Sequence, residues 1–408
     1  MDPPSATHDQ PGPESATETR KRPYRIGLLA NGDPDDVRTW SGVPNSIQRE
    51  LRKRFDEVVY VPSEPAPWTI FLKRINHHLH RLTGKRFIAQ WSAINARLHA
   101  KKIRARLKTH PVDALLAITV DQQIACLKNS PVPIIHHSDT TARGIENYYP
   151  AFSDLWGFAR RNGERITRGA IHNATLSVYP ARWSADSAIN DYGADPSTIH
   201  AVPYGANLKD PPTREEAIDC TPRDRCRMLW IGVEWDRKGG QLTYDTMVEL
   251  NKRGIDAEMV VVGAQPPEHC DHPNVTSHGF LNKQVPEQLA TYESLWKTAA
   301  FFMLPSRGET FGAVFCEAAA NGLPSISTAT GGVPDAVAHG ESGLLLPLDA
   351  GPAEYADAMA ALWNDRPAYE KMVQTSRDRY ENLLNWDAWA DAVTELIVDA
   401  IEKQNPKA

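Results

Sequence analysis

The chain has 408 residues, of which 41% are apolar and 24% charged, with a net charge of -6 at pH 7. This length allows two domains of ordinary size, and the acidic balance excludes a general nucleic-acid binder, which needs a basic excess. No stretch approaches the roughly 20 apolar residues of a membrane span, and the five scattered cysteines fit a reducing, cytoplasmic compartment.

The order of apolar runs and helical patterns predicts two α/β domains. Residues 1–20, rich in Pro, Ser, Thr and acidic residues, are predicted to form a disordered tail. Residues 21–207 and 208–384 each show a rhythm of short buried strands separated by helices, which indicates parallel sheets. Residues 385–408 contain an amphipathic helix, and a polar, proline-bearing linker follows Asn207. Strands are expected near residues 25–32, 58–61, 114–119, 134–137, 174–178, 200–202, 227–232, 257–263, 275–278, 300–304, 325–328 and 343–346.

The segment from 72 to 108 carries eleven Lys and Arg residues and no Asp or Glu. Phe87, Trp91, Ile94 and Leu98 recur at helical spacing within it, so a basic amphipathic helix is predicted. Two interpretations stay open. The helix is either an ordinary domain helix with a solvated basic face or a peripheral docking element for anionic lipid.

The segment from Phe301 to Gly322 predicts a buried strand, a tight loop and a short helix. Glu309 lies before that helix and Glu317 within it. The backbone N–H groups at the helix start, from Phe311 onward, favour an anion such as a phosphate. The two carboxylates would repel a phosphate, so we interpret them as acceptors for hydroxyl groups on either side of it. This arrangement is typical of a nucleotide-sugar site.

Arg237 and Lys238 follow a predicted buried strand and precede two glycines, which let the backbone approach a ligand closely. Arg can hold two phosphate oxygens in a fork and Lys acts as a point charge, so the pair could hold a diphosphate. A solvated surface pair is the alternative. In the first domain, His136 and His137 end a predicted strand, where they are either cleft residues or buried structural histidines.

Several of these motifs occur in a characteristic order along the chain. These are the Gly-x-x-x-x-x-Arg-Lys-Gly stretch, the Val-Val-Val-Gly strand end, the Gly279–Lys283 turn, the Glu309 to Glu317 pair and the Thr330-Gly-Gly-Val-Pro segment. As an ordered set they resemble the retaining glycosyltransferases of family four, the group 1 type. Most of the matching positions lie between about Val178 and Pro347. It thins in the first domain, where Trp40-Ser-Gly-Val-Pro stands in for the family's glycine pair.

The resemblance implies a GT-B fold, in which two Rossmann-like domains face each other across a cleft that binds a nucleotide sugar. It implies transfer of a sugar from a nucleoside-diphosphate donor to a hydroxyl acceptor with the anomeric configuration kept. It also implies that the C-terminal helix crosses back onto the first domain. By the same resemblance, roles are expected for the catalytic candidates Glu309, His137 and His136, and for the donor-binding candidates Arg237, Lys238, Thr310, Phe311, Gly312, Glu317, Gly42, Gly279 and Leu281. Among these, Glu309 would hold sugar hydroxyls and Glu317 the ribose.

We expect no metal and no cofactor other than the donor. The residues Asp33–Asp36 and His269–His272 lack the spacing of a zinc site. The expected acceptor is a glycan, a glycolipid or a small molecule, which would place the protein in polysaccharide or glycolipid synthesis at the inner membrane face. A glycoside hydrolase, a nucleotide-sugar epimerase and a non-catalytic nucleotide-sugar binder are the competing hypotheses.

Overall fold

The computed structural model describes residues 21–36, 42–63, 68–218 and 225–404. The predicted tail of residues 1–20 lies outside the described residues, as do Trp40 and Ser41 of the loop that precedes Gly42.

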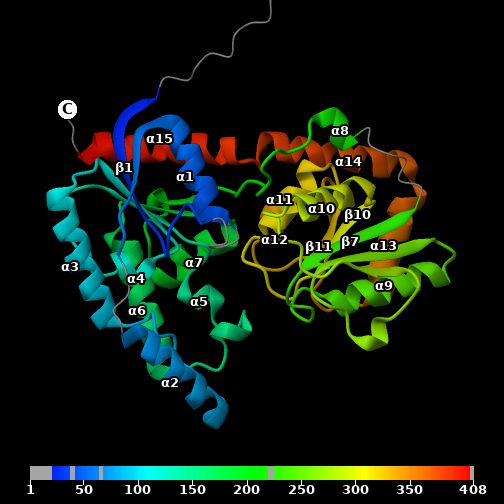
Figure 1. Cartoon of the computed structure of the whole chain (residues 1–408), viewed down its shortest axis with the longest axis horizontal. Coiled ribbons are helices and arrows are strands. Elements are labelled where there is room, and N and C mark those ends of the chain that lie inside the picture. The colour runs from blue at the N-terminus through cyan, green and yellow to red at the C-terminus, as the bar shows by residue number, and fades with distance from the viewer. Residues whose placement is uncertain (1–20, 37–41, 64–67, 219–224, 405–408) are drawn as a thin grey trace, which may run out of the picture.

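Each domain is built on a parallel six-stranded sheet, as predicted (Figure 1). The order is β2-β1-β3-β4-β5-β6 in the N-terminal sheet and β12-β11-β10-β7-β8-β9 in the C-terminal one. The first sheet contains β1 (Arg22–Leu29), β2 (Phe55–Tyr60), β3 (Ala114–Ile118), β4 (Ile134–His137), β5 (Leu176–Tyr179) and β6 (Ile199–Ala201). The second contains β7 (Cys226–Gly232), β8 (Ala257–Gly263), β9 (Val275–Ser277), β10 (Phe301–Leu304), β11 (Ser325–Thr328) and β12 (Gly343–Leu346).

Helices connect the strands and cover both sheets. In the N-terminal domain they are α1 (Val43–Arg54), α2 (Trp68–Thr83), α3 (Ala93–Thr109), α4 (Asp121–Ile124), α5 (Ala142–Ile145), α6 (Gly157–Asn173) and α7 (Arg182–Tyr192), with 3-10 turns η2 (Pro150–Phe152) and η3 (Pro196–Thr198). In the C-terminal domain they are α8 (Arg214–Ile218), α9 (Gly240–Lys252), η4 (Glu268–Cys270), α10 (Pro286–Thr298), α11 (Ala313–Ala320), α12 (Val333–Ala336), α13 (Pro352–Asn364) and α14 (Arg366–Asn382).

The central strands, such as β3, β4 and β10, are fully buried, which explains why they read as unbroken apolar runs. In β3, Leu116 packs into one core cluster, whereas its neighbours Leu115 and Ala117 pack into another. Strand neighbours alternate between the faces of a sheet, so both faces of β3 are covered. The β3 residue Ile118 pairs with His137 of β4, which aligns the carboxyl ends of these strands along one sheet edge.

The last helix, α15 (Trp386–Gln404), leaves the C-terminal domain and packs against α1 of the first (Figure 1). Its acidic residues Asp387 and Asp391 lie 3.1 and 2.8 Å from the guanidinium of Arg54 on α1. At the crossover, Asn207 accepts hydrogen bonds from the Ser46 hydroxyl and the Trp386 indole N–H, both at 3.0 Å. The linker residue Asn207 is therefore held by one residue of α1 and by the first residue of α15.

The predicted basic helix is wrong in its extent. Two helices, α2 and α3, replace it, and residues 84–92 connect them. Phe87 and Trp91 lie in the connection and only Ile94 and Leu98 lie on a helix. The reason is local. The Ser92 hydroxyl accepts a hydrogen bond from the Asn95 N–H and caps α3, so the helix begins after Trp91. In the described parts of the chain, no helix is long and apolar enough to cross a membrane.

Candidate active site

The predicted strand, loop and helix around Glu309 form as expected, with α11 beginning after Gly312 and ending before Asn321. Gly312 has φ 82°, a left-handed value that glycine adopts at low cost. Among the described residues, the N–H groups of Phe311, Gly312 and Ala313 have no protein acceptor. These N–H groups and the helix dipole therefore offer a site to an anion.

Lys238 and Arg237 converge on the Glu309 carboxylate. The Lys238 ammonium forms an ion pair with Glu309, and Arg237 Nη1 lies 3.8 Å from the same carboxylate oxygen. The Glu309 side chain is 9% exposed. Arg237 also donates to the backbone oxygen of Gly308 at 2.8 Å and pairs with Glu234. The predicted cation pair thus lies beside the predicted carboxylate, at the edge of the anion site.

A glycine makes this convergence possible. Gly239 follows the two cations, has φ 69° and starts α9. A Cβ at Gly239 would lie 2.2 Å from the backbone oxygen of Pro305, in the loop after β10. Any side chain here would push the two loops apart, so Gly239 permits the approach that joins Lys238 to Glu309.

Glu317 occupies a second, separate cluster. Its carboxylate accepts hydrogen bonds from the Lys283 ammonium at 3.0 Å and the Tyr292 hydroxyl at 2.5 Å. Burial and the charge of Glu317 raise the pKa of Tyr292, so its hydroxyl stays protonated and donates. Lys283 also lies 4.2 Å from the centre of the Tyr292 ring. Sequence reasoning missed Tyr292, because nothing in a helical pattern marks a buried tyrosine as a partner for Glu317.

The remaining donor-binding candidates lie on loops. Thr310 and Phe311 are buried beside Glu309, and Phe311 packs edge-on against Tyr204 with ring centres 5.4 Å apart. Gly279 follows β9, has φ 60° and faces open space where a Cβ would lie, while Leu281 packs against the core. Gly42 caps α1 in the first domain at φ 84°. The predicted ligand contacts of these residues stay predictions.

The two histidines are fully buried, which favours the interpretation as buried structural histidines over that as cleft residues. His136 is buried and bonds to Asp121 at 2.9 Å and to Ser177 at 3.0 Å, as a structural histidine would. His137 is stacked on Tyr204 and lies edge-on to Trp389 of α15. The physical reason is that the linker and α15 cover the end of β4.

His137 has an unusual environment for an imidazole. Both of its ring nitrogens lack a hydrogen-bond partner within the described part of the chain. Burial lowers its pKa to about 3, so the ring is neutral at pH 7. Next to it, Tyr204 donates a hydrogen bond of 2.5 Å to Asp139. Desolvation raises the pKa of Asp139 to about 6, an effect that this hydrogen bond opposes and the charge of Glu309 adds to.

Two tyrosines of the first domain, which sequence reasoning also missed, contact the loop that carries Glu309. The N–H of Glu309 donates to the Tyr148 hydroxyl and the N–H of Thr310 donates to the Tyr149 hydroxyl, each at 2.9 Å. The Arg237 guanidinium lies 4.7 Å from the centre of the Tyr149 ring. These contacts join the two domains at the candidate site.

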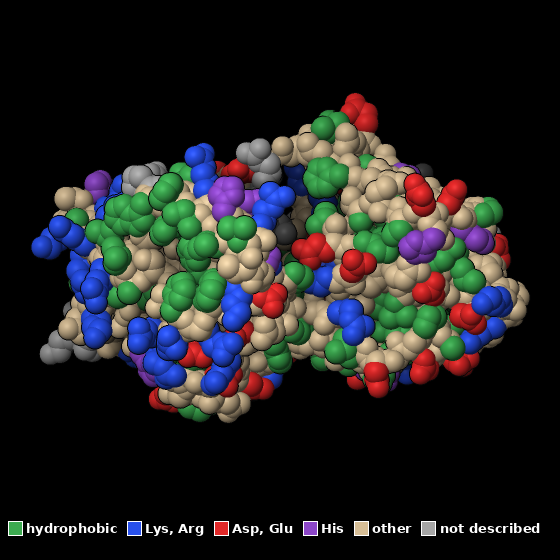
Figure 2. Space-filling view, turned by 90° about the horizontal axis from the view of Figure 1, so that it is seen from below, with side chains coloured by type: hydrophobic (Ala, Val, Ile, Leu, Met, Phe, Trp, Pro, Cys, Tyr) green, Lys and Arg blue, Asp and Glu red, His purple; other side chains and the backbone are tan. Residues whose placement is uncertain are grey.

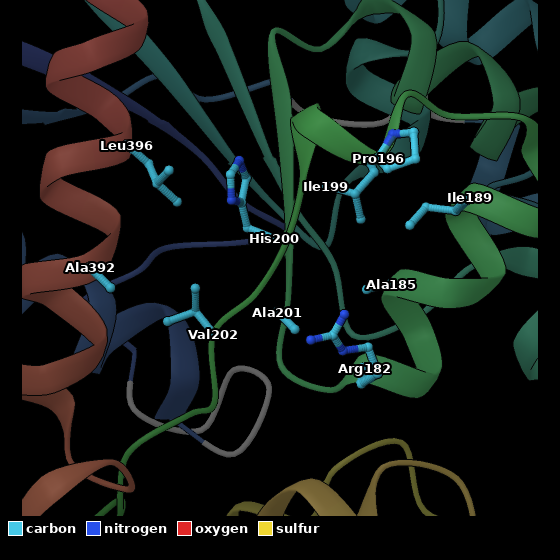
Figure 3. Close-up of a pocket in the computed structure, with 10 residues that line it drawn as sticks. All are labelled: Arg182, Ala185, Ile189, Pro196, Ile199, His200, Ala201, Val202, Ala392 and Leu396. Carbon is cyan, nitrogen blue, oxygen red and sulfur yellow. The ribbon is translucent and has the colours of Figure 1, made fainter.

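In the described ranges, no three His, Cys, Asp or Glu side chains are grouped so that they could hold a metal ion. A cavity of about 420 Å³ lies elsewhere, at the sheet edge formed by β6, between α7 and α15 (Figure 3). Its lining includes Arg182, Ile199 and Leu396, and none of the candidate site residues.

Comparison with known proteins finds similarity in the domain that carries most of these residues. Residues 225–365 match the family model described as glycosyl transferases group 1. The chain is 28% identical over 296 residues to a D-inositol 3-phosphate glycosyltransferase of Corynebacterium glutamicum (strain R), over 67% of this chain and 68% of the relative. It is 28% identical to that of Corynebacterium efficiens, where the match spans 64% of the relative. The matches thus span about two thirds of these relatives' length.

Solved structures resemble the whole fold. Sucrose-phosphate synthase from Thermosynechococcus elongatus superposes with a TM-score of 0.63 over 93% of this chain and 100% of that chain, at 17% identity. Anabaena Alr3699/HepE in complex with UDP and glucose gives a TM-score of 0.59 over 92% of this chain and 99% of that chain, at 15% identity. These likenesses establish a shared arrangement of two facing domains.

Proposed function

We propose that the chain is a glycosyltransferase of the group 1 type on a GT-B fold, and that it transfers a sugar from a nucleoside diphosphate to a hydroxyl acceptor with retention of configuration. The observation that carries the donor class is the convergence of Arg237 and Lys238 on Glu309 beside the unpartnered N–H groups at the start of α11. Cations and a helix N-terminus suit a diphosphate, and a carboxylate beside them suits sugar hydroxyls.

The charges of the reaction explain this arrangement. Breaking the bond to the leaving diphosphate builds negative charge on phosphate and positive charge at the anomeric carbon. Fixed cations at Arg237 and Lys238, with the N–H groups of Phe311 and Gly312, would stabilise that phosphate charge without rearrangement. Lys238 would turn from Glu309 to the diphosphate, which frees the carboxylate for sugar hydroxyls. On this proposal the protein's own cations serve the leaving group and no metal ion is needed.

Glu317, held by Lys283 and Tyr292, would bind the ribose of the donor. Glu317 and Glu309 pair with different residues, which does not favour a joint role as the acid and nucleophile of a retaining hydrolase. The glycosyltransferase relatives likewise do not favour an epimerase or a non-catalytic binder.

A thermal-shift series tests the donor proposal. UDP, GDP, ADP and TDP sugars are added in turn, with UDP-glucose first because Anabaena HepE has been solved with UDP-glucose. A donor at about 100 times its Kd stabilises the folded state by about 2.7 kcal/mol, which raises Tm by several degrees. We expect Arg237→Gln to lose this shift and the surface variant Arg253→Gln to keep it. Equal shifts in both variants would contradict the proposed diphosphate site.

A second assay tests transfer itself. Nucleoside diphosphate should be released only when an acceptor is present, and inositol phosphates are among the acceptors to be tested.

The surface of α2 supports a proposal about the acceptor. No apolar residue of α2 is buried, and Trp68, Phe71 and Leu82 are 44%, 63% and 82% exposed. Figure 2, seen from the side on which α2 lies, shows hydrophobic side chains gathered on the N-terminal half with Lys and Arg around them. We propose that this face docks on an anionic membrane surface, which would present a lipid-linked acceptor for polysaccharide or glycolipid synthesis.

Vesicle binding tests this docking. The triple variant Lys73→Gln, Arg74→Gln, Arg81→Gln removes three basic side chains of α2, each worth about 1 kcal/mol at an anionic surface. We expect its partition onto phosphatidylglycerol vesicles in co-sedimentation to fall at least about tenfold. The matched control replaces Lys252, Lys297 and Lys371 of the C-terminal domain by Gln and should bind as the wild type does. Equal recovery of both variants, insensitive to salt, would contradict membrane docking.

A further inference from the structure

Two consecutive tyrosines cross from the first domain to the loop that carries Glu309. Tyr148 and Tyr149 lie between α5 and η2, far in sequence from residues 309 and 310, yet their hydroxyls accept the N–H groups of both. The Tyr148 hydroxyl is also 3.2 Å from the Glu309 backbone oxygen and 3.0 Å from the Thr330 hydroxyl. A backbone segment of the C-terminal domain is thus hydrogen-bonded by side chains of the N-terminal domain.

The C-terminal domain has space for Tyr148 because two glycines surround it. A Cβ at Gly331 would lie 2.2 Å from the Tyr148 hydroxyl oxygen, and a Cβ at Gly308 would lie 2.9 Å from the Tyr148 backbone oxygen. Neither distance is compatible with a side chain at those positions. The two loops of the second domain therefore form a recess that fits Tyr148.

Tyr149 lies within the charged cluster itself. Its ring covers the Arg237 guanidinium, and its hydroxyl lies 3.5 Å from the Glu309 carboxylate and 3.3 Å from the Thr310 hydroxyl. Burial and the charge of Glu309 raise its pKa, so the hydroxyl is neutral at physiological pH and adds no charge to the cluster. Tyr149 contacts both the Arg237 guanidinium and the Glu309 carboxylate, so it can restrict the orientations of these two side chains.

We propose that Tyr148 and Tyr149 form an interdomain latch that holds the cleft closed over the donor, with Tyr148 as its anchor and Tyr149 as a positioning residue for Arg237 and Glu309. The consequence for catalysis rests on the proposed function. A closed latch excludes water from the anomeric carbon, which favours transfer over hydrolysis of the donor. The latch itself rests only on the contacts between the two domains.

Amide hydrogen exchange resolved at Glu309 and Thr310 tests the latch in the full-length, ligand-free protein. We expect Tyr148→Phe to speed exchange at the Glu309 amide about tenfold, and Tyr149→Phe to speed it equally at the Thr310 amide. In each variant the amide loses the tyrosine hydroxyl that accepts its hydrogen bond. Gly308→Ala should speed exchange at both amides by pushing Tyr148 from its recess. Tyr244→Phe, on the outer helix α9, is the matched control and should change neither amide. Unchanged exchange in both Tyr148→Phe and Gly308→Ala overturns the latch.

A second measurement separates a latch from a plug that the donor must displace. With UDP-glucose added, a latch keeps or increases the protection of both amides in the wild type, whereas loss of protection overturns the proposal. For Tyr149→Phe we expect kcat for transfer to fall with KM nearly unchanged, and the ratio of donor hydrolysis to transfer to rise several-fold. An unchanged ratio and an unchanged kcat would contradict the positioning role. If no nucleotide sugar binds, the proposed function fails, while the ligand-free exchange still decides the latch.

Discussion

Glu309→Gln is expected to lower turnover on the order of 10²–10³-fold, with much less effect on nucleotide affinity. The substitution keeps the shape of the side chain and removes the charge that pairs with Lys238 and lies 3.8 Å from Arg237. An amide is a weaker acceptor for sugar hydroxyls and does not balance the positive charge that builds at the anomeric carbon. Initial rates at saturating donor, with Kd for the nucleoside diphosphate measured by calorimetry, check both halves of this expectation.

The matched control for this experiment is Glu234→Gln. Glu234 also pairs with Arg237, but its side chain is 53% exposed and lies outside the Glu309 loop. We expect its turnover to stay within a few-fold of the wild type, because an exposed ion pair is worth little. If Glu309→Gln keeps full turnover, the carboxylate has no part in catalysis and the assignment of the sugar site is wrong.

Glu317→Ala is expected to weaken nucleotide binding by about 10- to 100-fold while turnover at saturating donor changes far less. The variant removes the proposed ribose acceptor and leaves the Tyr292 hydroxyl, now buried without a partner, and the Lys283 ammonium. Loss of a hydrogen bond to a charged group is worth about 1.5–3 kcal/mol, which gives this range. The measurement is titration with nucleoside diphosphate and, for comparison, with inorganic diphosphate, which carries no ribose.

Tyr292→Phe separates ribose binding from the support of the carboxylate. It keeps Glu317 and removes only the hydrogen bond of 2.5 Å, so we expect a smaller loss of affinity than in Glu317→Ala. Comparable turnover losses in Glu309→Gln and Glu317→Ala, with affinity unchanged in both, would show that the two carboxylates do not have the separate roles proposed here.

Much of the fold is readable in the order of residues. The run from Phe301 to Ala320 contains a buried strand, two glycines and an alanine-rich helix, and the structure confirms β10 and α11 within it. Such elements are marked by patterns among residues close in sequence, namely an apolar run, turn glycines and a segment of helix-forming residues. The predicted basic helix differs from α2 and α3 because the cap at Ser92 outweighs the apolar spacing of Phe87 and Trp91.

The sequence by itself indicated the two sheets, the helix start that is proposed to bind an anion, and the cations and carboxylates that are proposed to bind the donor, because each lies on one strand, loop or helix. Only the tertiary structure decided which of these groups meet. It pairs Lys238 with Glu309, places the Tyr292 hydroxyl in hydrogen-bond contact with the Glu317 carboxylate and buries His137 under α15. It also brought Tyr148 across to Glu309, 161 residues along the chain. The first two contacts depend on how loops and helices pack within the C-terminal domain, and the other two depend on how the first domain packs against the linker, α15 and the second domain. No local periodicity encodes this packing.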